Sequence, residues 1–309
     1  MAVSDVVVLG IFVADLAFEA PHLPKMGQTI LGQGFRMGPG GKGSNQAVAA
    51  GMAGANITFL TRLGTDSFGD IAINTWEAAG VNTRHVIRDE TRPTGAAFIF
   101  VSSETGDNAI IVESGAAGAL SPSDVEGAAA IIAGAKVFVT QLEQPMDAAQ
   151  RGLAVARAAG VTTIFNPAPA APLDDDVLAL CDYITPNETE AEAITGQPVT
   201  NHDEALAAAK ALRARGVGTA VLTLGAEGAL FYDGTVVEHI CAFSAGPVRD
   251  TTGAGDAFNG TFATALAEGM APLDAVRFGC AAAGISVTRK GAAASMATRD
   301  DIEALLKGR

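Results

Sequence analysis

The residues with the clearest chemical potential form one stretch, which runs from Asp250 to Asp256 and precedes a helical pattern beginning at Ala257. Its glycine-rich part, Gly253-Ala254-Gly255, can direct backbone N–H groups toward an anion, in line with the N-terminus of the following helix. A carboxylate beside such a site, here Asp256, is typical of the base that accepts a hydroxyl proton during phosphoryl transfer. An acidic residue at a helix start is also an ordinary cap, so both interpretations stay open.

A second glycine-rich stretch, Gly38-Pro-Gly-Gly-Lys-Gly43, leads into another helical pattern. Its GxGxxG spacing is that of a dinucleotide-binding fingerprint, but the fingerprint directly follows the first strand, and the first apolar run is Val6–Leu9, far upstream. A Walker A loop is excluded because Gly43 follows Lys42. With Lys42 and Asn45 as hydrogen-bonding groups, the stretch suits a polyhydroxylated ligand, and a tight turn before a helix is the alternative.

Three further sites carry acidic or amide side chains next to short strands. Asn187 and Glu190 have the spacing of a capping box, and the alternative is a role as outer ligands of Mg²⁺ and nucleotide phosphates. Asp15 follows the first strand, and Glu143 ends a later one. Because α/β sheets bind ligands at the carboxyl ends of their strands, Asp15 and Glu143 are candidate ligand contacts, although each alone is typical of a solvated loop carboxylate.

The elements that position these residues alternate along the chain. Buried strands are expected at 6–9, 57–60, 137–140, 162–165, 183–184 and 219–224. Helices are expected at 44–54, 68–79, 123–133, 146–159, 202–215, 257–268, 273–287 and 299–307. Strands that are apolar on both faces and alternate with helices predict an α/β fold with a mostly parallel sheet covered on both sides.

Two segments interrupt this alternation, 11–38 and 94–112. The first has no helical period, and the second predicts two strands, Ala96–Val101 and Ala109–Val112, joined by a turn. We interpret them as a small accessory sheet, either a lid over the site or an ordinary surface hairpin. No repeat or linker divides residues 1–309, so the sequence predicts one domain with a lid.

The composition excludes several classes of partner. Lys and Arg total 20 and Asp and Glu total 34, which gives a net charge of −14 and no electrostatic attraction to nucleic acid or an anionic membrane. No uncharged stretch is as apolar as the roughly 20 residues that a spanning helix needs, and no secretory signal precedes the first strand. Cys181, Cys241 and Cys280 are far apart and form no CxxC pair, so we expect a reduced, cytoplasmic protein.

These motifs occur together and in order over the whole chain, and with them the sequence resembles the ribokinase-like, PfkB-type carbohydrate kinases. The matching stretches are Gly40–Gly51, Asn166–Pro169, Ile184–Glu192, Asp250–Gly260 and Val287–Ala292. The resemblance implies a three-layer ribokinase-like fold, with helices on both faces of a mostly parallel sheet and a small β lid that also makes a homodimer contact. It further implies transfer of the γ-phosphate of ATP to a sugar hydroxymethyl group, most closely from D-ribose to D-ribose 5-phosphate.

The resemblance also assigns roles to individual residues. It implies that Asp256 is the catalytic base and that Gly253, Ala254 and Gly255 form the anion hole. The implied sugar contacts are Asp15, Gly41, Lys42, Gly43, Ser44, Asn45, Glu143 and Asp256. The implied nucleotide contacts are Asn187, Thr223, Leu224, Gly225, Ala226, Glu227, Gly228, Gly255 and Cys280. Mg²⁺ would be held through water by Glu190, and K⁺ by oxygen donors of Asp250, Thr252, Ser286, Arg289, Gly291 and Ser295.

One position departs from the pattern of the D-ribose kinases, which usually carry Asn two residues before the equivalent of Asp15. Here that position is Val13. Another acceptor is therefore an alternative, such as 2-deoxyribose, a ketohexose, a ketodeoxy sugar acid or a nucleoside. A nicotinamide-dependent oxidoreductase would depend on the misplaced GxGxxG, and the intact motif around Asp256 disfavours an inactive sugar sensor.

Overall fold

The computed structural model describes residues 4–308, and its centre is a nine-stranded sheet. In spatial order its strands are β13 (Val237–Ile240), β12 (Ala229–Tyr232), β11 (Thr219–Thr223), β10 (Tyr183–Ile184), β9 (Thr162–Phe165), β8 (Val137–Thr140), β1 (Val6–Leu9), β4 (Ile57–Gly64) and β5 (Val86–Asp89). Neighbouring strands are parallel from β11 to β5, and only the β11–β12 and β12–β13 pairs are antiparallel. The expected mostly parallel sheet is confirmed.

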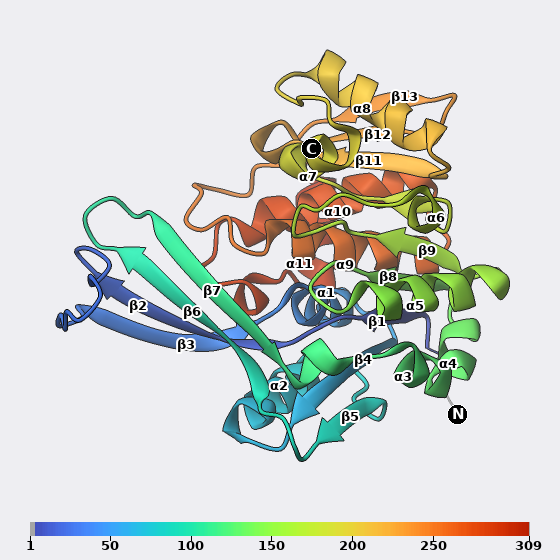
Figure 1. The fold of residues 1–309 in the computed structure, drawn as a ribbon. Helices are drawn as coiled ribbons and strands as arrows, with labels where there is room; N and C mark the ends of the chain where they lie inside the picture. Colours follow the sequence, from blue (N-terminus) through green and yellow to red (C-terminus); the bar gives the residue numbers. More distant parts are fainter. Residues whose placement is uncertain (1–3, 309) are drawn as a thin grey trace.

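Helices cover both faces of this sheet (Figure 1). One face carries α1 (Lys42–Met52), α2 (Ser67–Ala78), α9 (Ala254–Ala267), α10 (Pro272–Ser286) and α11 (Arg299–Lys307). The other carries α3 (Pro122–Gly127), α4 (Ala129–Ala133), α5 (Met146–Ala158), α6 (Asp175–Leu178), α7 (Glu188–Thr195) and α8 (His202–Ala214). In β1, Val6 and Val8 enter the first core cluster and Val7 and Leu9 the second, because successive side chains of a strand point to opposite faces.

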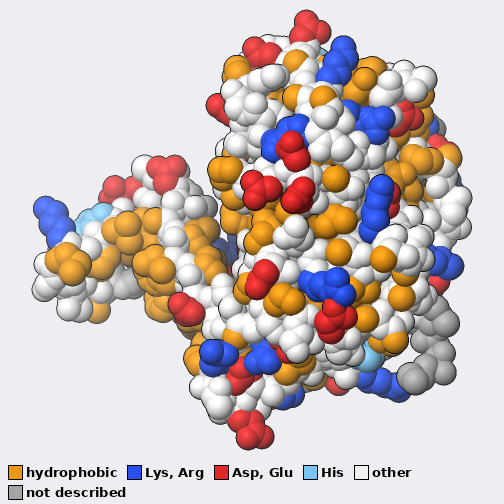
Figure 2. All heavy atoms as spheres, turned by 45° about the vertical axis from the view of Figure 1, so that its right-hand side comes forward, with side chains coloured by type: hydrophobic (Ala, Val, Ile, Leu, Met, Phe, Trp, Pro, Cys, Tyr) orange, Lys and Arg blue, Asp and Glu red, His pale blue; other side chains and the backbone are white. Residues whose placement is uncertain are grey.

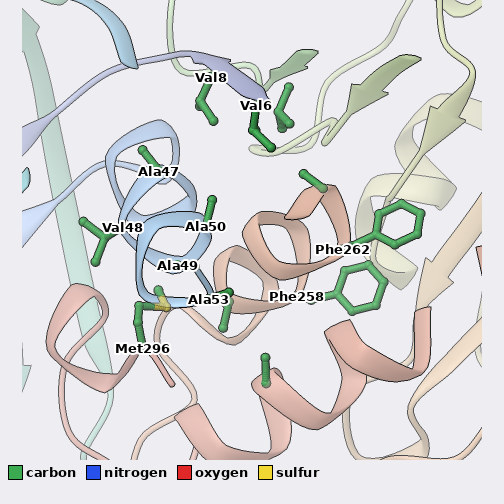
Figure 3. Packing of buried hydrophobic residues seen from close by; sticks show 14 of the residues in the cluster. Val6, Val8, Ala47, Val48, Ala49, Ala50, Ala53, Phe258, Phe262 and Met296 are labelled. Carbon is green, nitrogen blue, oxygen red and sulfur yellow. The ribbon is translucent and has the colours of Figure 1, made fainter. Parts of the chain in front are cut away.

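Two glycine contacts set the position of α1 against its neighbours. A Cβ on Gly260 of α9 would lie 2.3 Å from the carbonyl oxygen of Gln46, so the two helices cross with their backbones in close contact. A Cβ on Gly43 would lie 2.7 Å from the Cα of Gly10, which brings the start of α1 equally close to the end of β1. Phe258 and Phe262 of α9 belong to the same core cluster as the alanines of α1 and extend from α9 on the side away from α1 (Figure 3).

A second, four-stranded sheet projects from the body as an arm (Figure 1). Its order is β3 (Gly34–Gly40), β2 (Val13–Ala20), β6 (Thr94–Ser102) and β7 (Asn108–Gly115). The central β2–β6 pair is parallel, and the outer pairs are antiparallel. The accessory sheet expected from the two interrupting segments is present, and hydrophobic side chains gather on the arm at the surface (Figure 2).

Most expected elements agree with the structure to within a few residues, and three points need correction. The helix expected over 123–133 is two helices that meet at Ala128, directly after Gly127, a poor helix former. The helix expected to begin at Ala257 begins at Ala254. Strands β5, β12 and β13 and helix α6 were not expected: β5 and β13 carry charged side chains, α6 is a single turn without a side-chain cap, and β12 is a four-residue apolar run that sequence reasoning missed. Within residues 4–308, no helix is long and apolar enough to cross a membrane.

Candidate active site

The carboxylate of Asp256 lies in the first turn of α9 and faces α1. Asn45 Nδ2 donates to Asp256 Oδ2 at 3.0 Å, and Gln46 Nε2 donates to Asp256 Oδ1 at 3.1 Å. The N-cap of α9 is Gly253, with a φ of 79°, and no side chain caps the helix. The capping interpretation of Asp256 is therefore wrong, because its oxygens bind two amides of another helix. At 6% exposure the side chain is buried, yet it borders a polar cavity.

Four charged groups surround Asp256. Burial raises the pKa of Asp256 itself, and the positive charge of Lys42 is the largest opposing influence. Burial raises the pKa of Asp15 to about 6 and that of Glu143 to about 7, and the charge of Asp256 adds to both shifts. The pKa of Glu190 is raised by burial and lowered in part by Lys42. Lys42 is thus the cation that partly balances three of these carboxylates, Asp256, Glu143 and Glu190.

The glycine-rich stretch before α1 brings Asp15 and Lys42 into this site. Gly41 has a φ of 88°, and a Cβ on it would meet the carbonyl oxygen of Ile11 at 2.6 Å. On β3, a Cβ on Gly40 would lie 2.2 Å from Asp15 Oδ1, so only glycine leaves room for that carboxylate. Ser44 points elsewhere, because its buried Oγ accepts a hydrogen bond from Trp76 Nε1 at 2.9 Å.

Two adjoining cavities meet at the N-terminus of α9. The smaller, about 200 Å³, is bordered by Lys42, Glu190 and Asp256 and by the residues from Gly253 to Gly255. The larger, about 560 Å³, extends over Phe258, Cys280 and Val287. Residues that line both are Asn187, Thr223, Thr251, Ala254 and Gly255. The first turn of a helix leaves N–H groups without partners inside the helix, so the shared wall is suited to an anion.

Asn187 and Glu190 confirm the capping box that the sequence allowed, and their role as outer ligands of Mg²⁺ and phosphates stays a prediction. They form a capping box at the start of α7, with Asn187 Oδ1 accepting from Glu190 N and Glu190 Oε2 from Asn187 N, each at 2.8 Å. Both residues also line the polar cavity, and Glu190 is only 6% exposed. The cap therefore holds a buried carboxylate at the edge of the cavity.

The loop from 223 to 228 lines the larger cavity through part of its length. Thr223, Gly225, Ala226 and Gly228 border that cavity. Two predicted nucleotide contacts in the loop have other neighbours: Leu224 is buried in the second core cluster, and Glu227 Oε2 lies 2.7 Å from His202 Nε2. Cys280 lines the cavity from α10, and burial raises the pKa of its thiol to about 12.

The predicted cation ligands lie on two segments that contact each other. The amides of Arg249 and Asp250 both donate to the carbonyl of Val287, and Asp250 Oδ2 accepts from Gly291 N at 2.9 Å. The amide of Thr252 donates to Asp250 Oδ1. Ser286 and Ser295 donate their hydroxyls to carbonyls three residues earlier, and Arg289 binds Met296 O and Asp301. The segments offer carbonyl and carboxylate oxygens, the donors that a hard alkali cation prefers.

Sequence reasoning assigned no role to four buried amide residues of the site. Gln46 and Asn166 belong to matching stretches, but nothing in their spacing indicates that they contact each other across the fold. Gln46 Nε2 donates to Asn166 Oδ1 at 3.0 Å as well as to Asp256. Gln141 donates to Gln46, and Asn259 Nδ2 donates to the carbonyl of Gly255 at 2.8 Å.

Among residues 4–308, no group of three or more His, Cys, Asp or Glu side chains forms a metal centre.

A buried carboxylate beside a helix N-terminus, where two cavities meet over a covered parallel sheet, is an arrangement suited to phosphoryl transfer to a hydroxyl group. Residues 3–299 match the model of the pfkB family of carbohydrate kinases, and the chain belongs to that family. The expected class, an ATP-dependent carbohydrate kinase with a ribokinase-like fold, is thereby confirmed.

Several similar proteins align with this chain over most of both lengths. A ribokinase of Haemophilus influenzae is 41% identical over 95% of each chain. A deoxyribokinase of Salmonella typhi is 36% identical over 94% of this chain and 95% of its own. The structure of an Arabidopsis thaliana ribokinase complexed with ribose and ATP superimposes with a TM-score of 0.92 at 31% identity and covers 99% of both chains.

Proposed function

We propose that this protein transfers the γ-phosphate of ATP to the hydroxymethyl oxygen of D-ribose and forms D-ribose 5-phosphate and ADP. The single observation that carries the proposal is the position of Asp256, a buried carboxylate at the helix N-terminus where the polar cavity joins the larger one. The ribokinase relatives support D-ribose as the acceptor.

In the proposed reaction, Asp256 accepts the proton of the attacking hydroxyl while that oxygen forms a bond to the γ-phosphorus and the bond to ADP breaks. The N–H groups of Gly253, Ala254 and Gly255 stabilise the negative charge on the transferred group, that of Ala254 in exchange for the carbonyl of Thr251, to which it donates at 3.2 Å. The sugar hydroxyls are held by Asp15, Lys42, Asn45 and Glu143 and by the backbone from Gly41 to Ser44. The buried oxygen Oδ1 of Asn45, which has no hydrogen-bond partner within residues 4–308, is one acceptor available to a sugar hydroxyl.

The larger cavity is the proposed nucleotide site, with Asn187, the 223–228 loop and Cys280 around it. Its volume and its largely apolar lining fit a nucleotide, and the shared wall at the α9 N-terminus fits phosphates. Glu190 would hold Mg²⁺ through water, and the metal would neutralise phosphate charge when bound. Asp250, Thr252, Ser286, Arg289, Gly291 and Ser295 would hold K⁺ beside the anion hole. A cytoplasmic location stays a prediction.

A second acceptor, 2-deoxyribose, is favoured by one specific observation. Val13 is 3% exposed and packs with Ile11, Ala97 and Ala117, on the face of β2 that also carries Asp15. An apolar side chain beside the proposed sugar site offers no hydrogen bond to a hydroxyl, and a deoxyribokinase is among the relatives.

We also propose that the arm makes a homodimer contact and acts as a lid over the sugar. Phe18, Phe35 and Phe98 lie side by side on one face of the arm, with ring centroids 4.9 and 5.8 Å apart. Met37 and Ile111 extend this exposed apolar face at 51% and 70% exposure. Asp15 lies on the opposite face, so one sheet can bind a second copy and cover the sugar.

The experiment that tests the proposed function is phosphate transfer from ATP to a panel of purified acceptors. The panel contains D-ribose, 2-deoxyribose, ketohexoses, ketodeoxy sugar acids and nucleosides, and the products are separated and identified. We expect D-ribose 5-phosphate with D-ribose and a measurable rate with 2-deoxyribose. ADP formation that no acceptor in the panel stimulates would contradict the proposal.

A further inference from the structure

Behind the carboxylate of Asp256 lies a chain of three buried amides, which we call the amide chain: Gln141, Gln46 and Asn166. Gln141 Nε2 donates to Gln46 Oε1 at 2.6 Å, and Gln46 Nε2 donates to both Asn166 Oδ1 and Asp256 Oδ1. Asn166 Nδ2 in turn donates to the carbonyl of Thr185 at 3.0 Å. Gln46 and Gln141 are completely buried, so water offers them no alternative partner.

The direction of every hydrogen bond in the amide chain follows from Asp256. An ionised carboxylate only accepts, so Gln46 must present its NH₂ group to Asp256 and its oxygen to Gln141. Gln141 must then present its own NH₂ group to Gln46. This leaves Gln141 Oε1 buried with no partner in the described part of the chain, in space that Gly10 and Gly43 keep open. An unsatisfied buried acceptor costs about 1–3 kcal/mol of stability. The amide chain therefore carries this cost at Gln141, the end remote from Asp256.

The two carboxylate oxygens of Asp256 are held by different amides. Asn45 binds Oδ2 and Gln46 binds Oδ1, so the plane of the carboxylate cannot rotate without breaking one of these bonds. Asn45 also borders the proposed sugar site, whereas Gln46 is enclosed between α1, α9 and the sheet, where its carbonyl contacts Gly260. Gln46 therefore contacts Asp256 without bordering the sugar site, so its hydrogen bond can orient the carboxylate but cannot bind the substrate.

We propose that Gln46 is a positioning residue for the catalytic base: with its own amide fixed by Gln141, it locks the rotation of the Asp256 carboxylate so that an oxygen lone pair faces the acceptor hydroxyl. The proposal depends on the proposed function, since it presumes that Asp256 acts as the base. A general base contributes fully only within hydrogen-bond reach and alignment of the proton it removes.

The amide of Gln46 also keeps the base ionised. The charged groups around Asp256 are Lys42 from α1, Asp15 from β2, Glu143 after β8 and Glu190 from α7. Three of these four are acidic, and burial raises the pKa of Asp256. Lys42 lowers that pKa most, and the hydrogen bonds from Asn45 and Gln46 lower it as well. Loss of the Gln46 N–H therefore raises the pKa of the base.

The decisive variant is Gln46→Met, which keeps the length of the side chain and removes its hydrogen bonds. At pH 7 we expect kcat to fall by about tenfold to a hundredfold, with the KM for D-ribose and for ATP within about twofold of the wild type. The acidic limb of the kcat–pH profile should move to higher pH. An unchanged kcat and pH profile in the folded variant would overturn the proposal.

Gln141→Met supplies a second test that leaves every contact of Asp256 in place. It removes the donor that fixes the Gln46 amide, so we expect a smaller change in the same direction. Gln144→Met is the matched control: Gln144 is a buried glutamine that donates to Thr140 Oγ1 and to Gln141 O and makes no contact with Asp256. It should keep the wild-type pH profile. If Gln46→Met does not fold, a wild-type profile in Gln141→Met would overturn the proposal.

A double variant separates positioning from general loss of structure. In the Asp256→Asn background, adding Gln46→Met should leave the residual rate unchanged, because the base that Gln46 orients is already gone. A further loss equal to that in the wild-type background would refute positioning. Failure of the proposed function has a different signature: the wild type would not phosphorylate D-ribose, or Asp256→Asn would retain the wild-type rate.

Discussion

The backbone amide of Lys42 donates to Glu143 Oε2 at 2.7 Å, and this contact joins the start of α1 to the loop after β8. Glu143 stays partly buried among other carboxylates, and burial raises its pKa from 4.5 to about 7. The folded protein therefore binds this proton more tightly than the unfolded chain does. The contribution of Glu143 to stability falls as the pH rises from about 4.5 through 7.

Glu143→Gln should therefore stabilise the ligand-free protein at alkaline pH, because it removes a buried charge and keeps an oxygen for the Lys42 amide. At pH 8 we expect a gain on the order of 1–3 kcal/mol in the free energy of unfolding, and little difference at pH 4.5. Urea unfolding at the two pH values measures it, with exposed Glu77→Gln as the control. An equal effect at both values would show that ionisation of Glu143 is not the cause.

Asp256→Asn should abolish most turnover while the fold stays intact. A positioned general base contributes about 10²–10⁴ in rate, and we expect kcat to fall by that factor. Asn45 and Gln46 donate to different oxygens of Asp256, so the NH₂ group of asparagine would face one of these donors. The variant also removes a buried charge, so the melting temperature should change by only a few degrees. Retention of more than about a third of the wild-type kcat would exclude Asp256 as the base.

K⁺ should activate the enzyme if the segments around Asp250 and Gly291 hold a monovalent cation. The ion would order the loop before α9 and add positive potential where phosphate charge develops. Replacing K⁺ by Na⁺ or Tris should lower kcat severalfold without changing the circular dichroism spectrum. Asp250→Asn should remove most of the difference between the cations. Identical rates in all three buffers would refute the site.

Val13→Asn should raise the preference for D-ribose over 2-deoxyribose. A new hydrogen-bonding group beside Asp15 is expected to favour the acceptor that carries the additional hydroxyl, by at least about fivefold in the ratio of kcat/KM values. Val13→Ala is the control, because it changes the volume of the side chain without adding a hydrogen bond. An unchanged ratio in Val13→Asn would mean that position 13 does not contact the sugar.

Ile111→Lys should weaken self-association if the apolar face of the arm binds a second copy. The side chain is 70% exposed in the single chain, so a lysine there leaves the monomer fold unaffected and places a charge in the proposed contact. Sedimentation velocity over a concentration series measures the change. Val237→Lys, on the edge strand β13 of the main sheet, is the matched control with an exposed valine. A wild type that is monomeric throughout would contradict the dimer.

Particular residues show which features of the fold and the site could be predicted from the sequence. The strand Val6–Leu9 and the helix at 299–307 were predictable to the residue, because a run buried on both faces and a capped helix leave local signals. Asp15, Lys42, Asp256 and Glu190 were predictable as candidates because they stand in motifs. The Gln46–Gln141 contact was not, because it joins residues 95 positions apart and depends on how α1 packs on the sheet. Likewise, the role of Asp256 at α9 depended on where that helix begins.

The crossing at Gly260 has a mechanical consequence. Helix α1 brings Asn45 and Gln46 to the site and α9 brings Asp256, and at Gly260 the backbones of the two helices are in close contact. Such a joint gives neither helix room to slide or tilt. The amides of α1 and the carboxylate of α9 therefore move together as one rigid body. Motion that admits a sugar and releases its product is left to the arm, whose strand β2 brings Asp15 to the site from outside that joint.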